Sequence, residues 1–130
     1  MVSIIIPVLN EEKKLKGFLT FLENIKGRKE IILVDGESTD NTAFIAGKYA
    51  KVLFSERGRS KQMNKGAKYA EGNVLWFLHA DSIVDPNSIN YIEKAIEDKN
   101  IGGGFSLYFY DFNTLFMRYI SKTSNIRAEK

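Results

Sequence analysis

The chain has 130 residues, 44% of them hydrophobic, and a net charge of +3, so it can bury one core and calls for no second domain. The charge is too small to indicate nucleic acid or a membrane surface as a partner, but it is compatible with a small anionic ligand. There is no cysteine and a single histidine, His79, which excludes disulfide frameworks, thiolate zinc sites, cysteine nucleophiles and multi-histidine metal sites.

The first half of the chain predicts strands that alternate with helices. Residues 2–8 are rich in β-branched side chains and predict a buried strand that Pro7 ends. Asn10 is the predicted N-cap of a helix over residues 11–24, in which apolar residues recur at helical spacing.

Two further strands are predicted over residues 30–34 and 52–54. Between them, a run of Ser, Thr and Asp predicts the start of a helix over residues 38–49, with Asp40 as its cap. A basic loop follows the third strand and leads into a helix over residues 61–69.

The second half continues the alternation. Residues 74–78 predict a fourth strand, and residues 85–87 open a helix with Pro86 in its first turn. Residues 102–110 predict an aromatic-rich strand and residues 112–123 a final helix. The pattern indicates an α/β fold, with a doubly wound, mostly parallel sheet and helices on both faces. Because the final helix needs a further packing partner, we expect a domain that is incomplete at the C-terminus or that self-associates.

Two predicted strands end on carboxylates, at Asp35 and Asp81. Ligands of an open α/β sheet bind outside the carboxyl ends of its strands, so both side chains are expected to line one crevice. That arrangement suits a phosphorylated ligand and a divalent cation, Mn²⁺ or Mg²⁺. The alternatives are a turn aspartate at Asp35 and, after Asp81, helix caps at Ser82 and Asp85.

His79 lies two residues before Asp81, so both side chains point the same way on an extended segment. A neutral imidazole would ligate a metal and a charged one would meet a phosphate; the alternative is a histidine satisfied by hydrogen bonds. Arg57, Arg59 and Lys61 form a basic loop before a helix. Such a loop favours a diphosphate, and its alternative is a solvated run of charge.

Four motifs occur together along the chain. They are residues 3–12 (SIIIPVLNEE), 32–42 (ILVDGESTDNT), 58–66 (GRSKQMNKG) and 78–81 (LHAD). In order and spacing they resemble the family 2 glycosyltransferases of the GT-A fold. The resemblance implies a Rossmann-like domain over residues 1–130, which binds a nucleotide-diphosphate sugar and forms the N-terminal part of a glycosyltransferase domain. The substrate-binding residues that it implies are Pro7, Asn10, Glu11, Asp35, Arg57, Arg59, Asn64 and His79.

In the resemblance, Asp81 matches the last carboxylate of the metal-binding Asp-x-Asp motif, and His79 replaces the first. The implied reaction is an inverting, metal-assisted transfer of a sugar to an acceptor that is itself a sugar, a lipid or a small molecule. Mn²⁺ or Mg²⁺ would neutralise charge on the leaving diphosphate. Family members usually take their catalytic base from a region beyond the end of this chain, so no catalytic residue is nominated.

Two other functions remain open at this point. A non-catalytic nucleotide-binding or assembly module would keep the fold without turnover. A dinucleotide enzyme is disfavoured because no G-x-G-x-x-G follows the first strand. We expect no nucleic-acid partner and a cytoplasmic location, since no signal peptide or membrane-spanning run is present. Aromatic residues between 105 and 112 form either core packing or an acceptor platform, and contact with the inner face of a membrane is a further expectation.

Overall fold

A computed structural model describes residues 1–97 of the chain, so the strand predicted over 102–110 and the helix over 112–123 lie outside the described residues. The described elements are β1 (Val2–Val8), α1 (Glu12–Asn24), β2 (Lys29–Asp35), α2 (Thr42–Ala46), β3 (Lys51–Phe54), α3 (Arg59–Tyr69), β4 (Val74–Phe77) and α4 (Ser88–Glu97). They divide into two compact units. The first runs over residues 1–24 and 28–81, and the described part of the second holds residues 25–27 and 82–97. That residues 1–130 form one domain stays a prediction.

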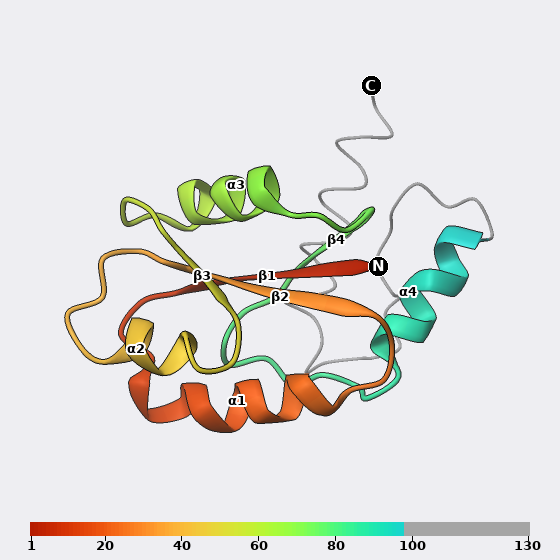
Figure 1. Cartoon of the computed structure of the whole chain (residues 1–130), viewed down its shortest axis with the longest axis horizontal. Coiled ribbons are helices and arrows are strands. Elements are labelled where there is room, and N and C mark those ends of the chain that lie inside the picture. Colours follow the sequence, from red (N-terminus) through yellow and green to blue (C-terminus); the bar gives the residue numbers. More distant parts are fainter. Residues whose placement is uncertain (98–130) are drawn as a thin grey trace. The chain divides into compact units, whose positions relative to one another are not determined.

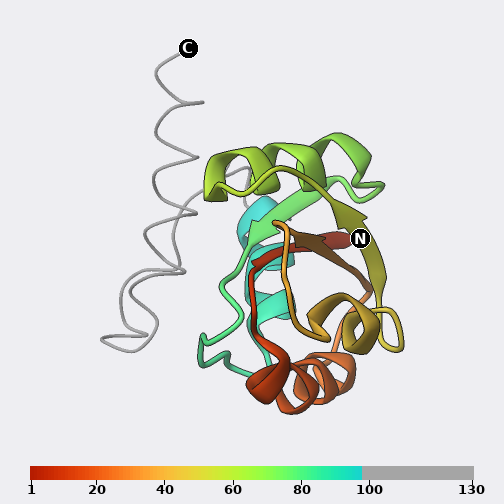
Figure 2. The same cartoon turned by 90° about the vertical axis from the view of Figure 1, so that its left-hand side faces the viewer.

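The first unit is built on a four-stranded parallel sheet in the order β3-β2-β1-β4. β1 pairs with β2 along its whole length, from Val2 opposite Lys29 to Val8 opposite Asp35. α3 covers one face of this sheet, and α1 and α2 lie together on the other (Figures 1 and 2). The predicted doubly wound α/β sheet with helices on both faces is confirmed.

The core follows from the central position of β1. A parallel strand with helices over both faces is apolar throughout, and Ile4, Ile5 and Ile6 are completely buried. Trp76 of β4 is also completely buried. On α1, the buried residues are Leu15, Leu19 and Leu22, which recur at the helical spacing that the sequence predicts.

The starts of α1 and α2 differ from the predictions. Asn10 is not the cap of α1; it has a φ of 51°, and its side-chain oxygen accepts the N–H of Thr39 at 2.8 Å. The predicted helix over residues 38–49 is shortened to Thr42–Ala46. The N-cap position is Asn41 and makes no side-chain cap hydrogen bond, so the prediction of Asp40 as the cap is wrong. The Asp40 carboxylate lies one residue earlier and accepts the N–H of Thr42 at 2.9 Å. The residues before it are held in a turn, where Asp35 accepts the N–H of Ser38 at 3.0 Å.

The starts of α3 and α4 differ as well. α3 begins two residues earlier than predicted, at Arg59, directly after Gly58 with its φ of 139°. α4 begins at Ser88, so Pro86 lies in the turn that precedes the helix rather than in its first turn. That turn is closed by Asp85, whose carboxylate accepts the N–H of Asn87 at 2.7 Å.

The described part of the second unit has a small hydrophobic core of its own. Ile25, Val84 and Ile89 are buried there. Gly27 has a φ of 114°, and a side chain at that position would overlap Ile89 of α4. Only glycine meets both requirements, a left-handed backbone and close approach to a neighbour.

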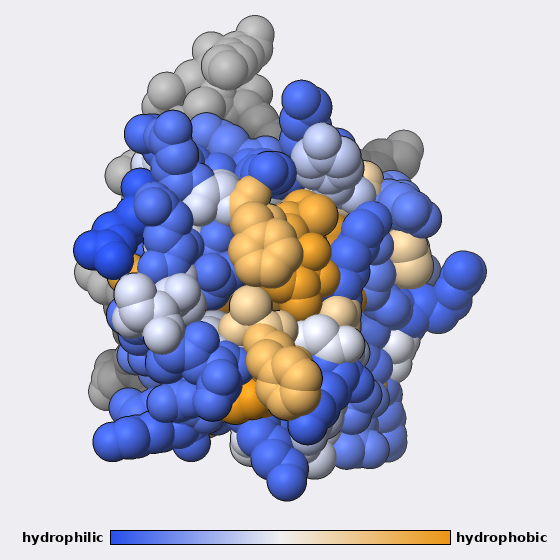
Figure 3. Space-filling model, turned by 60° about the vertical axis from the view of Figure 1, so that its left-hand side comes forward, coloured by the Kyte–Doolittle hydropathy of each residue, from blue (hydrophilic) through white to orange (hydrophobic). Residues whose placement is uncertain are grey.

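Apolar side chains gather among hydrophilic ones on one face of the molecule (Figure 3). The most exposed aromatic residues among residues 1–97 are Phe44 of α2 and Phe54 of β3, at 69% and 59%. The ammonium group of Lys48 lies 4.7 Å from the centre of the Phe44 ring, a cation–π contact.

Within residues 1–97, no helix combines the length and the apolar character needed to cross a bilayer. Self-association and membrane contact stay predictions.

Glu30 joins three segments at the amino end of the sheet. Its Oε2 accepts hydrogen bonds from the hydroxyl of Ser3 at 2.6 Å and from the N–H groups of Glu71 and Gly72 at 2.6 and 3.2 Å. Burial works to raise the pKa of the Glu30 carboxyl, but these hydrogen bonds and the charge of Lys51 outweigh it. The pKa therefore lies below its ordinary value of 4.5.

The Glu30→Gln substitution is expected to lower the free energy of unfolding by about 1–2 kcal/mol at pH 7, because it weakens charge-assisted hydrogen bonds. Since the folded-state pKa is lowered, the contribution of Glu30 is complete above the unfolded value of 4.5 and is lost as the pH falls through the folded value. Urea unfolding over this pH range measures the effect, with the exposed Glu23→Gln as control. If Glu30→Gln left the acid-dependent loss of stability unchanged, the assignment would be wrong.

Candidate functional site

A pocket opens at the carboxyl end of the sheet. It is lined by Pro7, Val8, Leu9, Glu11, Arg57, Gly58, Arg59, Gln62, His79, Ala80 and Asp81. These residues come from the end of β1, the loop and first turn of α3, and the segment after β4. The cavity has a volume of about 260 Å³, slightly below the range typical of drug-sized ligands.

Pro7 explains why β1 and β4 part at this point. The ladder between them continues as far as a hydrogen bond from the N–H of Leu78 to the carbonyl of Ile5, at 2.9 Å. On this side of β1 the next donor would be residue 7, and proline has no N–H. With the strand order β3-β2-β1-β4, the gap lies where the winding of the sheet reverses direction. Open α/β sheets bind their ligands at this position.

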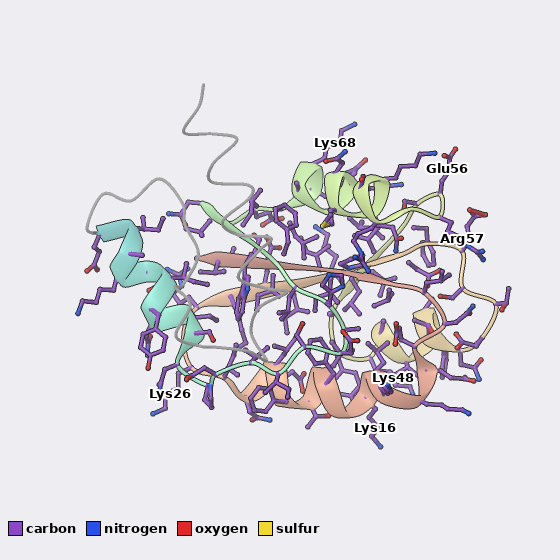
Figure 4. The ribbon with its side chains drawn as sticks, turned by 180° about the vertical axis from the view of Figure 1, so that it is seen from behind. Lys16, Lys26, Lys48, Glu56, Arg57 and Lys68 are labelled. Atoms are coloured by element: carbon purple, nitrogen blue, oxygen red, sulfur yellow. The ribbon has the colours of Figure 1, made fainter. Side chains whose placement is uncertain are left out.

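The loop before α3 carries cations to the pocket. Arg57 and Arg59 are exposed and line it, and the N–H of Arg57 is fixed by Oε1 of Glu37 at 2.9 Å. Figure 4 shows Glu56 and Arg57 projecting from this loop. Lys61, the third cation of the predicted basic loop, instead pairs with Glu56 at 2.6 Å on the surface. Two of the three predicted cations therefore face the pocket.

The segment after β4 brings His79 and Asp81 to the same pocket. His79 is buried, at 8% exposed, whereas Asp81 is exposed. Burial lowers the pKa of His79 and the charge of Arg59 lowers it further, while Asp81 acts in the opposite direction. The imidazole is therefore neutral at pH 7, which favours a metal-ligating role over a charge contact with phosphate.

The titration of His79 tests this electrostatic environment. Its NMR midpoint is expected below the ordinary 6.5, because burial opposes the charged form. Stability should fall as the pH drops from 6.5 toward the folded-state pKa, since only the unfolded chain takes up the proton there. Arg59→Gln should raise the midpoint and Asp81→Asn should lower it further. A wild-type midpoint at or above 6.5 would show that the imidazole is not held neutral.

The structure gathers six of the nine predicted site residues at this pocket. They are Pro7, Glu11, Arg57, Arg59, His79 and Asp81. The other three are not among its lining residues. The side chain of Asn10 holds Thr39, and Asn64 is exposed on α3. Asp35 is 3% exposed, and its Oδ1 has no hydrogen-bond partner among residues 1–97. Ligand contacts for all nine stay predictions.

Gln62 is the side chain at this site that the sequence analysis missed. It is 4% exposed, and its Nε2 donates to the carbonyls of Val8 and Val34 at 3.0 and 2.8 Å. Its Oε1 accepts the N–H of Gly58 at 3.3 Å. The sequence does hold one signal for Gln62. It lies four residues before Gly66, so both residues are on the same face of α3.

Comparison with known proteins identifies the family. The model for glycosyl transferase family 2 matches residues 3–129. The chain belongs to this family. One relative is the 4,4'-diaponeurosporenoate glycosyltransferase of Staphylococcus haemolyticus (strain JCSC1435), 34% identical over 105 residues, which cover 74% of this chain and 28% of the relative. The poly-beta-1,6-N-acetyl-D-glucosamine synthase of Staphylococcus aureus (strain COL) is 29% identical over 110 residues, covering 78% and 27%. This family 2 chain thus spans little more than a quarter of either relative.

Solved structures share the fold of this chain. The mannosyltransferase PcManGT from Pyrobaculum calidifontis, in complex with GDP-Man and Mn²⁺, superimposes with a TM-score of 0.68 at 21% identity, covering 78% of this chain and 33% of that one. TarS 1-349 of S. aureus gives a TM-score of 0.65 at 26% identity, with 78% and 33% covered. The predicted GT-A fold of this family 2 glycosyltransferase chain is thereby confirmed.

Proposed function

We propose that the chain is the nucleotide-sugar-binding part of an inverting, metal-assisted glycosyltransferase. The observation that carries the proposal is the pocket between β1 and β4, where Arg57 and Arg59 face the same cavity as His79 and Asp81. A nucleotide-diphosphate donor needs phosphate contacts and a divalent cation. Two arginines would supply the first, and a carboxylate with an imidazole would ligate the second.

The phosphate contacts would come from the start of α3. Arg57 and Arg59 provide planar guanidinium groups, which bind phosphate oxygens in pairs. α3 begins at Arg59, so its N-terminal N–H groups and the positive end of its dipole lie at the same pocket. Pro7 and Glu11 line the cavity on the β1 side, where we place the nucleoside. Contacts from Asn10, Asp35 and Asn64 to the donor remain part of the proposal.

The donor atoms in the pocket fit Mn²⁺ or Mg²⁺ bound together with a diphosphate. Asp81 offers an exposed carboxylate and His79 a neutral imidazole. Among residues 1–97, no group of three or more His, Cys, Asp or Glu side chains could hold a metal. Protein sites for Mg²⁺ often use one or two carboxylates and take the other ligands from phosphate and water. When bound, the ion supplies Lewis-acid stabilisation of charge on the diphosphate.

The side chains of this chain would act mainly on the leaving group. As the bond from the sugar to the diphosphate breaks, negative charge grows on the phosphate oxygens, and Arg57 and Arg59 are placed to stabilise it. The acceptor hydroxyl, of a sugar, a lipid or a small molecule, must lose a proton to a base. No residue of the described part is assigned that role.

Release of free sugar from the donor separates this function from its rival. UDP-glucose and GDP-mannose are incubated with the chain and Mn²⁺, and slow release of sugar is expected to depend on Arg59. Arg59→Ala should suppress it, whereas Lys68→Ala, at the other end of α3 (Figure 4), should not.

The rival is a non-catalytic nucleotide-binding module, which the histidine at position 79 favours because Asp is usual there. Nucleotide binding without any release would support that module. If neither binding nor release occurred, the proposed donor site would be wrong.

A further inference from the structure

We infer that Gln62 is a positioning residue, which fixes the arginine-bearing loop to the ends of β1 and β2, and that Gly36 is glycine to make room for it. The inference rests on the proposed function, because the loop is held where it would grip the donor diphosphate. In this inference the arginines of the loop contact the diphosphate, and Gln62 holds the loop in place without touching the reacting atoms.

One carboxamide connects three separate segments. Nε2 of Gln62 donates to the carbonyl oxygen of Val8, at the end of β1, and to that of Val34, one residue before the end of β2. Oε1 accepts the N–H of Gly58, which lies between the two arginines that line the pocket. Gln62 therefore ties the loop between the arginines to both strand ends, in addition to the hydrogen bond from the N–H of Arg57 to Glu37.

The chemistry of this position suits an amide. Two carbonyl oxygens require donors and one N–H requires an acceptor, which the two ends of a carboxamide supply together. A carboxylate at position 62 would lose both donated bonds and would place negative charge against two carbonyl oxygens. An apolar side chain would lose all three bonds. At 4% exposed, Gln62 has little access to water that would replace them.

The Gln62 carboxamide also explains why position 36 is a glycine. A Cβ atom at position 36 would lie 2.6 Å from Cδ of Gln62, 2.7 Å from Oε1 and 2.8 Å from Nε2, and these are its three nearest atoms. Among residues 1–97, the glycines with positive φ are Gly27 and Gly58, so the backbone of Gly36 is open to other residues. Space for the carboxamide, rather than backbone conformation, requires glycine there.

Gly66 brings the helix close enough for this contact. It lies one turn after Gln62 on the same face of α3, and a Cβ there would overlap the side chain of Ile5 in β1. Without that Cβ, the helix backbone approaches the sheet closely. Gln62 can then reach the carbonyls at the strand ends.

The test uses two single variants and their combination. Gln62→Ala and Gly36→Ala are each expected to weaken binding of GDP or UDP, with Mn²⁺ present, by about tenfold in Kd, as supporting residues around a site commonly do. The double variant should bind no more weakly than Gln62→Ala alone, because the overlap at Gly36 disappears with the carboxamide. Gly17→Ala is the matched control, since a Cβ there meets nothing within 4 Å.

A second cycle separates positioning from a general structural role. If Gln62 acts through the arginines, Gln62→Ala should weaken binding much less in an Arg59→Ala background than in wild type. Equal effects in both backgrounds would overturn the inference, as would a Gly36→Ala variant that binds like wild type. Should Gln62→Ala not fold, Gly36→Ala alone carries the first comparison. A wild-type chain that binds neither nucleotide would overturn the proposed function, and this inference with it.

Discussion

Replacing Asp81 by alanine is expected to weaken binding of GDP or UDP in the presence of Mn²⁺ by at least about tenfold, or about 1.4 kcal/mol. Asp81 is the exposed carboxylate that follows β4 in the pocket, next to a neutral His79. Without a divalent cation, the same substitution should leave binding unchanged or strengthen it, because it removes a negative charge from an anion site. Calorimetric titrations with and without Mn²⁺ measure both effects.

The dependence of the loss on the metal makes the result specific. A damaged fold would weaken binding under both conditions, whereas loss of a metal ligand weakens it only when the metal is present. Glu23→Ala removes the same charge from the exposed side of α1 and should change neither titration. If Asp81→Ala bound nucleotide with Mn²⁺ as tightly as wild type, Asp81 would not be the metal ligand.

Gly66→Ala is expected to destabilise the fold by about 1–3 kcal/mol, although alanine is the better helix former. The added Cβ would overlap the Ile5 side chain and lie 3.2 Å from Cγ2 of Val34, so α3 would have to move off the sheet. Neither neighbour can yield easily, because both side chains are completely buried in the central strands. Urea unfolding measures the free energy difference.

Gly17→Ala provides the comparison within the same protein. Gly17 is also a helix-interior glycine, on the exposed side of α1, and a Cβ there meets nothing within 4 Å. Its replacement should therefore stabilise the protein by up to about 1 kcal/mol from helix propensity alone. Equal effects of the two substitutions would contradict the close packing of α3 on β1.

The sequence predicts the sheet well because its signals are local. The apolar runs that form the buried strands β1 and β2 stand out on their own, and the turn residues after them fix the strand ends to within a residue. The length of α2 could not be predicted in this way. Its start depends on Asp35, Asp40 and Asn10, which hold the residues before it in a turn, and Asn10 lies 29 residues from its partner Thr39.

At the functional site, too, local sequence signals were predictive and contacts between distant residues were not. Arg57, Arg59, His79 and Asp81 were predicted because charged or titratable residues next to strand ends and helix starts point to a binding edge. Gln62 gives no such signal. Its role is visible only when α3 is placed on the sheet, since its partners Val8 and Val34 lie 54 and 28 residues away. The gap made by Pro7 likewise appears only once β4 is paired beside β1.

The binding of a nucleoside diphosphate in the pocket between β1 and β4 is tested most directly through His79. As the only histidine of the chain, it gives a ring signal that reports on this pocket alone. With Mg²⁺ present, titration with GDP or UDP is expected to shift that signal saturably, and replacement of Mg²⁺ by paramagnetic Mn²⁺ should broaden it. If neither nucleotide perturbed the His79 signal of the folded chain with either metal, the pocket would not be the donor site.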